Sequence, residues 1–326
     1  MGVVSGRNLS IGMIGVGRMA RSHAAVLQTL PNVVLKACCG RHIESGKAFA
    51  EEFGIAEVYV GHQDLLDRAE VDVYWVTASV LELPGVAKAC LRTGKAVFLE
   101  KPVGLSLAEA KEVADVAAQS SAIHMVGMNR RFYSNINAAL RLAEKHGGIR
   151  GIEVHAPEDI TDLQNHHPTR VVERWIYMNG VHCIDLLRYL GGEVATVTAA
   201  QVGQVGIDGQ RGYAALLKFK SGVLGQYTSH WYAPDRWRVT LYADDLCCQI
   251  QPLESGKAIY RGGHEEPLPL SEEDQQFKPG FHEQAKYFID CVSAGRPVAC
   301  PGCDLNDYLK TVGLVDAISG ERPLTN

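Results

Sequence analysis

Residues 9–20 read LSIGMIGVGRMA. The run Leu9–Ile14 is apolar, as in a strand that is buried on both faces, and a helix-like segment follows the glycines. Gly15, Gly17 and Ala20 form the pattern GxGxxA, which between a strand and a helix is a fingerprint of dinucleotide binding. Gly15 permits the tight turn, Gly17 lets the backbone approach a pyrophosphate, and Ala20 lets helix and strand pack closely. The sequence therefore predicts a nicotinamide cofactor here, with an ordinary glycine turn as the alternative.

The end of the second expected strand, Val33–Cys39, distinguishes NAD from NADP. An NAD-binding protein usually places Asp or Glu there, on the ribose 2′-hydroxyl. This chain continues instead with Gly40 and Arg41, and a guanidinium can bind a 2′-phosphate with two hydrogen bonds. We therefore expect NADP, the alternative being that Arg41 is a solvated residue. Since helix N-termini offer free N–H groups to phosphates, Arg18 and Met19 are further expected cofactor contacts.

Apolar runs alternate with amphipathic segments up to about residue 128. The other expected strands are Val71–Val76, Ala96–Leu99 and His124–Met128, and the expected helices are Arg18–Leu30, Glu44–Phe53, Leu83–Thr93 and Leu107–Ala118. Ser106 followed by Glu109 reads as a capping box at the start of the last of these helices. Alternation of strands and helices predicts parallel βαβ units. We expect residues 1–128 to form a cofactor-binding α/β domain with a doubly wound parallel sheet.

The pattern changes in residues 129–326. A helical segment, Asn135–His146, a strand, Gly151–His155, and a helix, Met178–Leu190, come first. The strand candidates that follow are Thr196–Val202, Tyr213–Phe219, Val223–Trp231, Arg238–Ala243 and Cys247–Ile250, and the closing helices are Glu283–Ala294 and Leu305–Ile318. Turn signals such as Asp208-Gly209 favour hairpins, and therefore a mainly antiparallel sheet. We expect a second α/β domain here, whose C-terminal helices can pack back on the first.

Composition narrows the class of protein. The 326 residues are 46% hydrophobic with a net charge of −5, which excludes a disordered chain and gives no attraction to nucleic acid or anionic membranes. No run reaches the ~18 apolar residues of a membrane span, and residues 1–10 lack the apolar part of a secretion signal. The nine cysteines lie mostly in apolar runs, as reduced thiols do, and Cys300 and Cys303 have no second pair at zinc spacing. We expect a cytoplasmic protein with a small-molecule partner and no metal.

Three further motifs accompany the glycine pattern: GKAVFLEKP at 94–102, NRRF at 129–132 and GVHCIDLLRYLGG at 180–192. Together they resemble the glucose–fructose oxidoreductase / inositol dehydrogenase / MocA (Gfo/Idh/MocA) family over nearly the whole chain. The resemblance implies a Rossmann domain, then a substrate domain built on an open, mainly antiparallel sheet that serves a homodimer or homotetramer. It also implies reversible hydride transfer between NAD(P) and a secondary alcohol of a sugar or cyclitol.

The resemblance assigns roles to individual residues. Lys101 corresponds to the family's catalytic lysine and His182 to its acid/base histidine. The cofactor-contacting positions of the motifs are Thr77, Ser79, Glu100 and Lys101, and the substrate-contacting positions are Asn129 and Arg130. From the residues themselves, Arg174 could bind an anionic group of the substrate. Asp185 follows His182 by three residues on one helix face and is expected to orient its imidazole.

Two positions depart from the family pattern. Where the family usually has Asp four residues before the histidine, this chain has Met178. The loop that usually reads T-P-x-x-x-H is TASVLEL at 77–83. These departures keep open an imine in place of a carbonyl substrate, or a non-catalytic NADP-binding regulator. Because Lys101 and His182 are both retained, we expect an NADP(H)-dependent oxidoreductase that acts on a carbonyl or hydroxyl of a sugar-like molecule.

Overall fold

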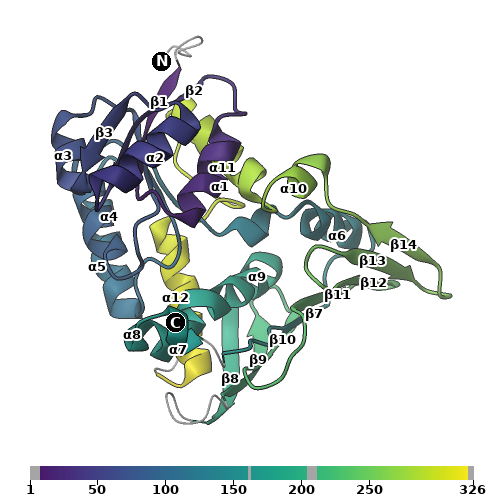
Figure 1. Ribbon diagram of the computed structural model, residues 1–326. Coiled ribbons are helices and arrows are strands. Elements are labelled where there is room, and N and C mark those ends of the chain that lie inside the picture. The colour runs from purple at the N-terminus through teal and green to yellow at the C-terminus, as the bar shows by residue number, and fades with distance from the viewer. Residues whose placement is uncertain (1–7, 161–162, 204–210, 322–326) are drawn as a thin grey trace. The chain divides into compact units, whose positions relative to one another are not determined.

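The computed structural model describes residues 8–160, 163–203 and 211–321 (Figure 1). The chain divides into two compact units, Met1–Asn129 with Gln276–Leu309, and Arg130–Gln275 with Lys310–Asn326. The first unit therefore includes a stretch from near the C-terminus. The expected division into a cofactor-binding domain, residues 1–128, and a substrate domain, residues 129–326, stays a prediction. The expected turn at Asp208-Gly209 lies outside the described residues.

The first unit contains a six-stranded parallel sheet. Its strands are β1 (Leu9–Ile14), β2 (Val33–Gly40), β3 (Glu57–Val60), β4 (Val73–Val76), β5 (Ala96–Leu99) and β6 (His124–Val126). They lie in the order β3-β2-β1-β4-β5-β6, and every neighbouring pair is parallel. This is the strand order of dinucleotide-binding sheets, so the predicted doubly wound parallel sheet is confirmed.

Helices of the first unit connect these strands. They are α1 (Arg18–Leu27), α2 (Ile43–Phe53), α3 (Gly61–Arg68), α4 (Leu83–Arg92) and α5 (Leu107–Ala118), and α11 (Phe281–Ser293) belongs to the same unit but comes later in the chain and connects none of the six strands. The predicted cap of α5 is confirmed at Ser106, whose Oγ accepts the Glu109 N–H at 3.2 Å; the Glu109 carboxylate in turn accepts the N–H of Leu105, the residue before the cap, at 3.0 Å. The strand β3 and the helix α3 were not predicted. Late in the chain, α11 packs against α1.

The second unit contains an eight-stranded mixed sheet. Its strands are β7 (Gly151–His155), β8 (Val194–Val202), β9 (Gly212–Phe219), β10 (Leu224–His230), β11 (Arg238–Tyr242), β12 (Leu246–Ile250), β13 (Gly256–Tyr260) and β14 (Glu265–Leu268). The order is β14-β13-β12-β11-β7-β10-β9-β8. Among the strand pairs of the described residues, β7–β10 alone is parallel, so the predicted mainly antiparallel sheet is confirmed.

One face of this sheet is covered by helices. In Figure 1, α9 (Val181–Gly191) lies along β7 and β10, and α6 (Ser134–Lys145) packs on β11 and β12. Buried and exposed residues alternate along β9 and β10, as one covered and one open face require. The shorter elements are η1 (Asn129–Phe132), α7 (Leu163–His166), α8 (Thr169–Glu173), η2 (Ile176–Gly180) and α10 (Glu272–Gln276), and α12 (Leu305–Ser319) follows them.

The helix expected at Met178–Leu190 begins later than predicted. Residues Ile176–Gly180 form the π-helical turn η2, and the α-helix α9 starts only at Val181. Such turns displace the register of the side chains around them and are frequent at functional sites.

The described residues contain neither a membrane-spanning helix nor a cluster of metal-binding side chains. No helix among them is both long and apolar enough to cross a membrane. Within the same residues, no group of three or more His, Cys, Asp or Glu side chains is arranged to hold a metal ion.

Candidate active site

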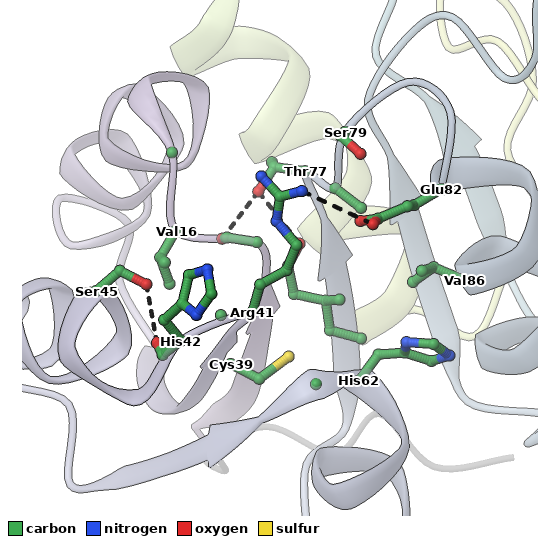
Figure 2. A pocket seen from close by; sticks show the side chains of 16 residues that line it. Val16, Cys39, Arg41, His42, Ser45, His62, Thr77, Ser79, Glu82 and Val86 are labelled. Carbon is green, nitrogen blue, oxygen red and sulfur yellow. Dashed lines mark hydrogen bonds and ion pairs between the residues drawn. The ribbon is translucent and has the colours of Figure 1, made fainter.

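A cavity of about 490 Å³ lies in the first unit, where β1, β2 and β4 end (Figure 2). Ligands of open α/β sheets bind at these carboxyl ends of the strands. Its lining brings together six of the predicted cofactor residues, namely Gly15, Gly17, Gly40, Arg41, Thr77 and Ser79. The remaining polar lining includes His42, Ser45, His62 and Glu82.

The glycine turn after β1 is shaped for a ligand. Gly15 has φ +97°, and a Cβ there would lie 2.6 Å from the carbonyl oxygen of Thr77, so no other residue fits. The Thr77 hydroxyl fastens the same turn by donating to the Gly15 carbonyl at 3.1 Å. A Cβ on Gly17 would meet nothing within 4 Å, which means that the backbone there faces open space. These features fit the close approach of a pyrophosphate to the chain.

Arg41 provides a guanidinium at the end of β2. Its side chain is 74% exposed, and its Nη1 lies 4.0 Å from the Glu82 Oε1. Figure 2 shows Arg41 reaching across the cavity toward Glu82, which comes from the β4–α4 segment. Nearby, the Ser45 hydroxyl donates to the His42 carbonyl at 2.9 Å. In the pocket wall, burial raises the pKa of Cys39 to about 12, so this thiol stays protonated.

The turn after β5 carries Glu100 and Lys101. Glu100 is 8% exposed; its Oε1 lies 2.8 Å from the His23 Nε2, and its Oε2 accepts the Lys101 backbone N–H at 2.9 Å. Burial would raise the pKa of Glu100, but the hydrogen bond to His23 and the charges of Lys101 and Lys278 bring it below its ordinary value. The carboxyl group is therefore ionised at neutral pH. His23 is a partner that the sequence analysis missed, because no local spacing connects it to Glu100.

The first turn of α1 meets a residue from the other end of the chain. The Met19 Sδ lies 3.7 Å from the Lys278 Nζ, and Arg18 beside it is exposed. The next residue along, Pro279, accepts a hydrogen bond through its carbonyl from the Asn129 Nδ2 at 2.9 Å. The predicted substrate contact Asn129 is thus buried and attached to this stretch.

In the second unit, His182 lies near Trp237, on whose ring the Arg130 guanidinium stacks. His182 is the second residue of α9 and is 4% exposed. Its ring centroid lies 6.4 Å from that of Trp237, and the guanidinium carbon of Arg130 lies 4.4 Å from the same Trp237 ring. Trp237 therefore joins two predicted site residues, a relation that the sequence did not indicate.

A carboxylate also approaches the π-helical turn before His182. The Glu158 carboxylate accepts hydrogen bonds from the Asn179 Nδ2 at 2.8 Å and from the Trp175 Nε1 at 3.2 Å. These two donors flank Met178, the position at which the family pattern has Asp. Glu158 thus supplies an acidic group to this region from a distant part of the chain, and it was missed for that reason.

The structure corrects the expected pairing of Asp185 with His182. The Asp185 Oδ1 accepts from the Arg131 Nη2 at 2.6 Å and the Thr311 hydroxyl at 2.8 Å, and its Oδ2 accepts from the Arg131 Nε at 2.7 Å. Both carboxylate oxygens are therefore held by groups other than the imidazole. A bidentate guanidinium is the stronger partner for a buried carboxylate.

The other predicted residues lie as follows. Arg174 is paired with Glu321, the Nη1 lying 2.7 Å from the Oε1, and both side chains are partly exposed. Lys101 belongs to the first unit and His182 to the second.

Two family models match this chain. One describes an oxidoreductase family with an NAD-binding Rossmann fold and matches residues 9–128, and the other describes the GFO/IDH/MocA C-terminal domain and matches residues 141–246. The chain belongs to the GFO/IDH/MocA oxidoreductase family.

The similarity of this GFO/IDH/MocA chain to known proteins covers most of its length. It is 25% identical to myo-inositol 2-dehydrogenase of Thermotoga maritima over 322 residues, covering 91% of this chain and 92% of that protein. It is 26% identical to trans-1,2-dihydrobenzene-1,2-diol dehydrogenase of Mus musculus over 301 residues, covering 87% and 88%. A structure of levoglucosan dehydrogenase, in complex with NADH and L-sorbose, shares the fold with a TM-score of 0.83 at 17% identity, covering 98% of this chain and 100% of that one. The protein is therefore an enzyme of an oxidoreductase family whose first domain is an NAD-binding Rossmann fold.

Proposed function

We propose that this GFO/IDH/MocA enzyme depends on NADP(H) and acts on a carbonyl or secondary alcohol of a sugar-like or cyclitol-like molecule. The observation that carries the cofactor choice is Arg41 in the pocket wall, at the end of a strand that supplies no carboxylate. A guanidinium binds a 2′-phosphate, whereas Asp or Glu at this place would repel it. The substrate class is supported by the relative named myo-inositol 2-dehydrogenase, which the chain matches over most of its length.

Lys101 and His182 are the proposed catalytic residues. When bound, the cofactor supplies or accepts the hydride. In reduction, the Lys101 ammonium polarises the carbonyl and stabilises the negative charge that develops on its oxygen. His182 donates the proton, since imidazole titrates nearest to neutral pH. Arg130, held over the Trp237 ring, binds polar groups of the substrate.

The cofactor is proposed to be held by the pocket residues and the first turn of α1. Gly15 and Gly17 let the backbone approach the pyrophosphate, and the free N–H groups at Arg18 and Met19 complete its site. Thr77 and Ser79 line the same cavity on the side of β4.

The dissociation constants of NADPH and NADH test this proposal. We expect NADPH to bind more tightly, and Arg41→Ala to weaken NADPH binding by about 10- to 100-fold, the effect of losing a charge-assisted hydrogen bond, while NADH binding changes little. Glu82→Gln is the matched variant. It removes the carboxylate that competes for Arg41, so NADPH should bind about two- to fivefold more tightly, the scale of an exposed ion pair. Equal constants for both cofactors in the unmodified protein would contradict the NADP assignment.

We further propose that the enzyme is cytoplasmic and forms a homodimer or homotetramer through the open face of the second sheet. None of the nine cysteines, all of which lie in the described residues, is part of a disulfide, as a reducing compartment favours. Leu216 and Leu224 are 65% and 63% exposed on neighbouring strands, an apolar surface that a second copy could cover. A monomer in light scattering at micromolar concentration would contradict this assembly.

A further inference from the structure

His23 lies in a closed aromatic environment within the first unit. It is a residue of α1, three positions after the last residue of the glycine motif, and it is 0% exposed. Its ring stacks on Phe281 with a centroid distance of 4.3 Å and an interplanar angle of 19°. The ring centroids of Phe98 and Trp75 lie 5.3 and 5.4 Å from that of His23. The imidazole is therefore fixed in position from several sides.

The polar contact of His23 is with Glu100. An ionised carboxylate only accepts hydrogen bonds, so the His23 Nε2 carries the hydrogen and donates across 2.8 Å to the Oε1. Among the residues that the structure describes, the His23 Nδ1 has no hydrogen-bond partner. A buried polar atom without a partner costs stability, and a phenylalanine would fill the same space without that cost. Packing alone therefore does not account for a histidine here.

The second oxygen of Glu100 connects this bond to Lys101. The Oε2 accepts the backbone N–H of Lys101 at 2.9 Å, so the orientation of the carboxylate sets the orientation of that peptide group. The charged or titratable groups that face Glu100 are His23 from α1, Lys101 from its own turn and Lys278 from the segment before α11. Burial opposes the charge of Glu100, and these three groups maintain it.

We propose that His23 is a positioning residue for the Glu100–Lys101 turn. By donating to Glu100 it keeps this carboxylate ionised and turned toward the Lys101 N–H, and in this way it fixes the backbone from which the Lys101 side chain projects. The proposal rests on the catalytic role assigned to Lys101 above. It also connects the helix that holds the cofactor's pyrophosphate to the residue that polarises the substrate.

Two substitutions separate the hydrogen bond from the packing. His23→Phe keeps an aromatic ring against Phe281 and removes the donor, whereas His23→Gln keeps an N–H donor at similar reach and removes the ring. We expect His23→Phe to lower kcat by about 10- to 100-fold, the cost of a misplaced reacting group, with the cofactor dissociation constant unchanged. His23→Gln should stay within about threefold of the unmodified enzyme, because a neutral side-chain donor remains. The opposite order, with His23→Phe fully active, would overturn the proposal.

The pH profile gives a readout that a packing role would not change. Without its donor, the buried Glu100 should have a raised pKa, so kcat of His23→Phe should fall as the pH decreases through that value. The profile of His23→Gln should stay close to that of the unmodified enzyme. An unchanged acid limb in His23→Phe counts against the proposal.

A third measurement does not need turnover. The Glu100 carboxyl can be titrated by NMR in protein labelled with [5-¹³C]glutamate, with Glu100→Gln to assign the signal. We expect Glu100 to titrate at higher pH in His23→Phe than in the unmodified protein, and an unchanged titration overturns the proposal. If the unmodified protein oxidises no sugar or cyclitol with either cofactor, the proposed function fails, while this titration still decides the role of His23. If His23→Phe does not fold, loss of turnover in folded His23→Gln overturns the proposal.

Discussion

Two buried carboxylates, one in each unit, have different surroundings. Asp185 is 1% exposed, and its oxygens accept two hydrogen bonds from the Arg131 guanidinium and one from the Thr311 hydroxyl. Glu100 is 8% exposed and accepts one bond from an imidazole and one from a backbone N–H. Burial alone therefore does not distinguish a carboxylate that stabilises the fold from one that belongs to a functional site.

The two carboxylates differ in their hydrogen-bond donors, a guanidinium for Asp185 and an imidazole for Glu100. A guanidinium does not lose its proton in proteins, so Arg131 remains a cation beside the Asp185 carboxylate. This pair joins η1, α9 and α12 within the second unit, as a structural anchor would. Glu100 follows the end of a parallel strand, next to Lys101, where ligands of such sheets bind. Its environment is therefore suited to chemistry as well as to stability.

The largest effect is expected on the Glu100 side of this comparison. Lys101→Ala should lower kcat by about 10²- to 10⁴-fold, because the ammonium group that we propose as the stabiliser of charge on the substrate oxygen is lost. The cofactor dissociation constant should change little. Steady-state kinetics with the best substrate of a sugar and cyclitol panel would measure it.

Lys95 offers a matched control at the other end of the same strand. It lies over the Tyr74 ring at 5.4 Å, before β5 begins. Lys95→Ala should leave kcat unchanged. Normal turnover in Lys101→Ala would show that the motif at residues 100–102 is not the catalytic one.

The next effect is expected on the stability of the second unit. Asp185→Asn leaves the Arg131 guanidinium, which is 2% exposed, without its counter-charge and should destabilise the fold by about 3–5 kcal/mol. The kcat of the molecules that remain folded should change little. Urea unfolding and kinetics at low temperature would measure the two quantities.

Replacing both partners sharpens this test. The double variant Arg131→Met with Asp185→Leu removes the charges together and should recover much of the lost stability, since apolar pairs often replace buried ion pairs at little cost. A variant Asp185→Asn that is fully stable but slow would restore the role first expected for Asp185, as a partner of His182.

The smallest effect is expected in acid. Because the folded pKa of Glu100 lies below its ordinary value, its ionisation contributes stability that is complete above about pH 4.3 and disappears as the pH falls through the folded pKa. Urea midpoints of the unmodified protein and of Glu100→Gln should therefore differ at neutral pH and converge below about pH 4. A difference that stays constant down to pH 3 would mean that the charge of Glu100 does not contribute.

Local sequence patterns predicted most of the fold. The bounds of β1, β5 and α5 agree with the expected ranges, because long apolar or capped segments carry a strong local signal. The strand β3, Glu57–Val60, was missed since four residues with a charge among them show no clear period. The start of α9 was misplaced because the π-helical turn Ile176–Gly180 leads directly into it. The apolar residues of this turn extend the helical pattern of the sequence to positions before the α-helix begins.

The cofactor end of the site was easier to predict than the rest. Gly15, Gly17 and Arg41 lie within motifs that are contiguous in sequence, and they meet in one cavity. The partners of Asp185 and Glu100, in contrast, are 54 and 77 positions away from them. Pairings at such separations depend on tertiary packing, which one sequence does not reveal. Whether Lys101 and His182 act together stays a prediction.

The discontinuous first unit has a consequence for synthesis on the ribosome. Met19 and Lys278 are in contact although they are 259 positions apart, and Phe281 stacks on His23 from the same late segment. At about 5–20 residues per second, translation needs roughly 10–50 s to cover that separation. During this interval the parallel sheet can form, but the aromatic surface made by His23, Trp75 and Phe98 is not yet covered, because Phe281 has not been synthesised. The nascent chain therefore passes through a stage in which this surface is open to chaperones and to aggregation, and that stage ends only after Phe281 has been synthesised.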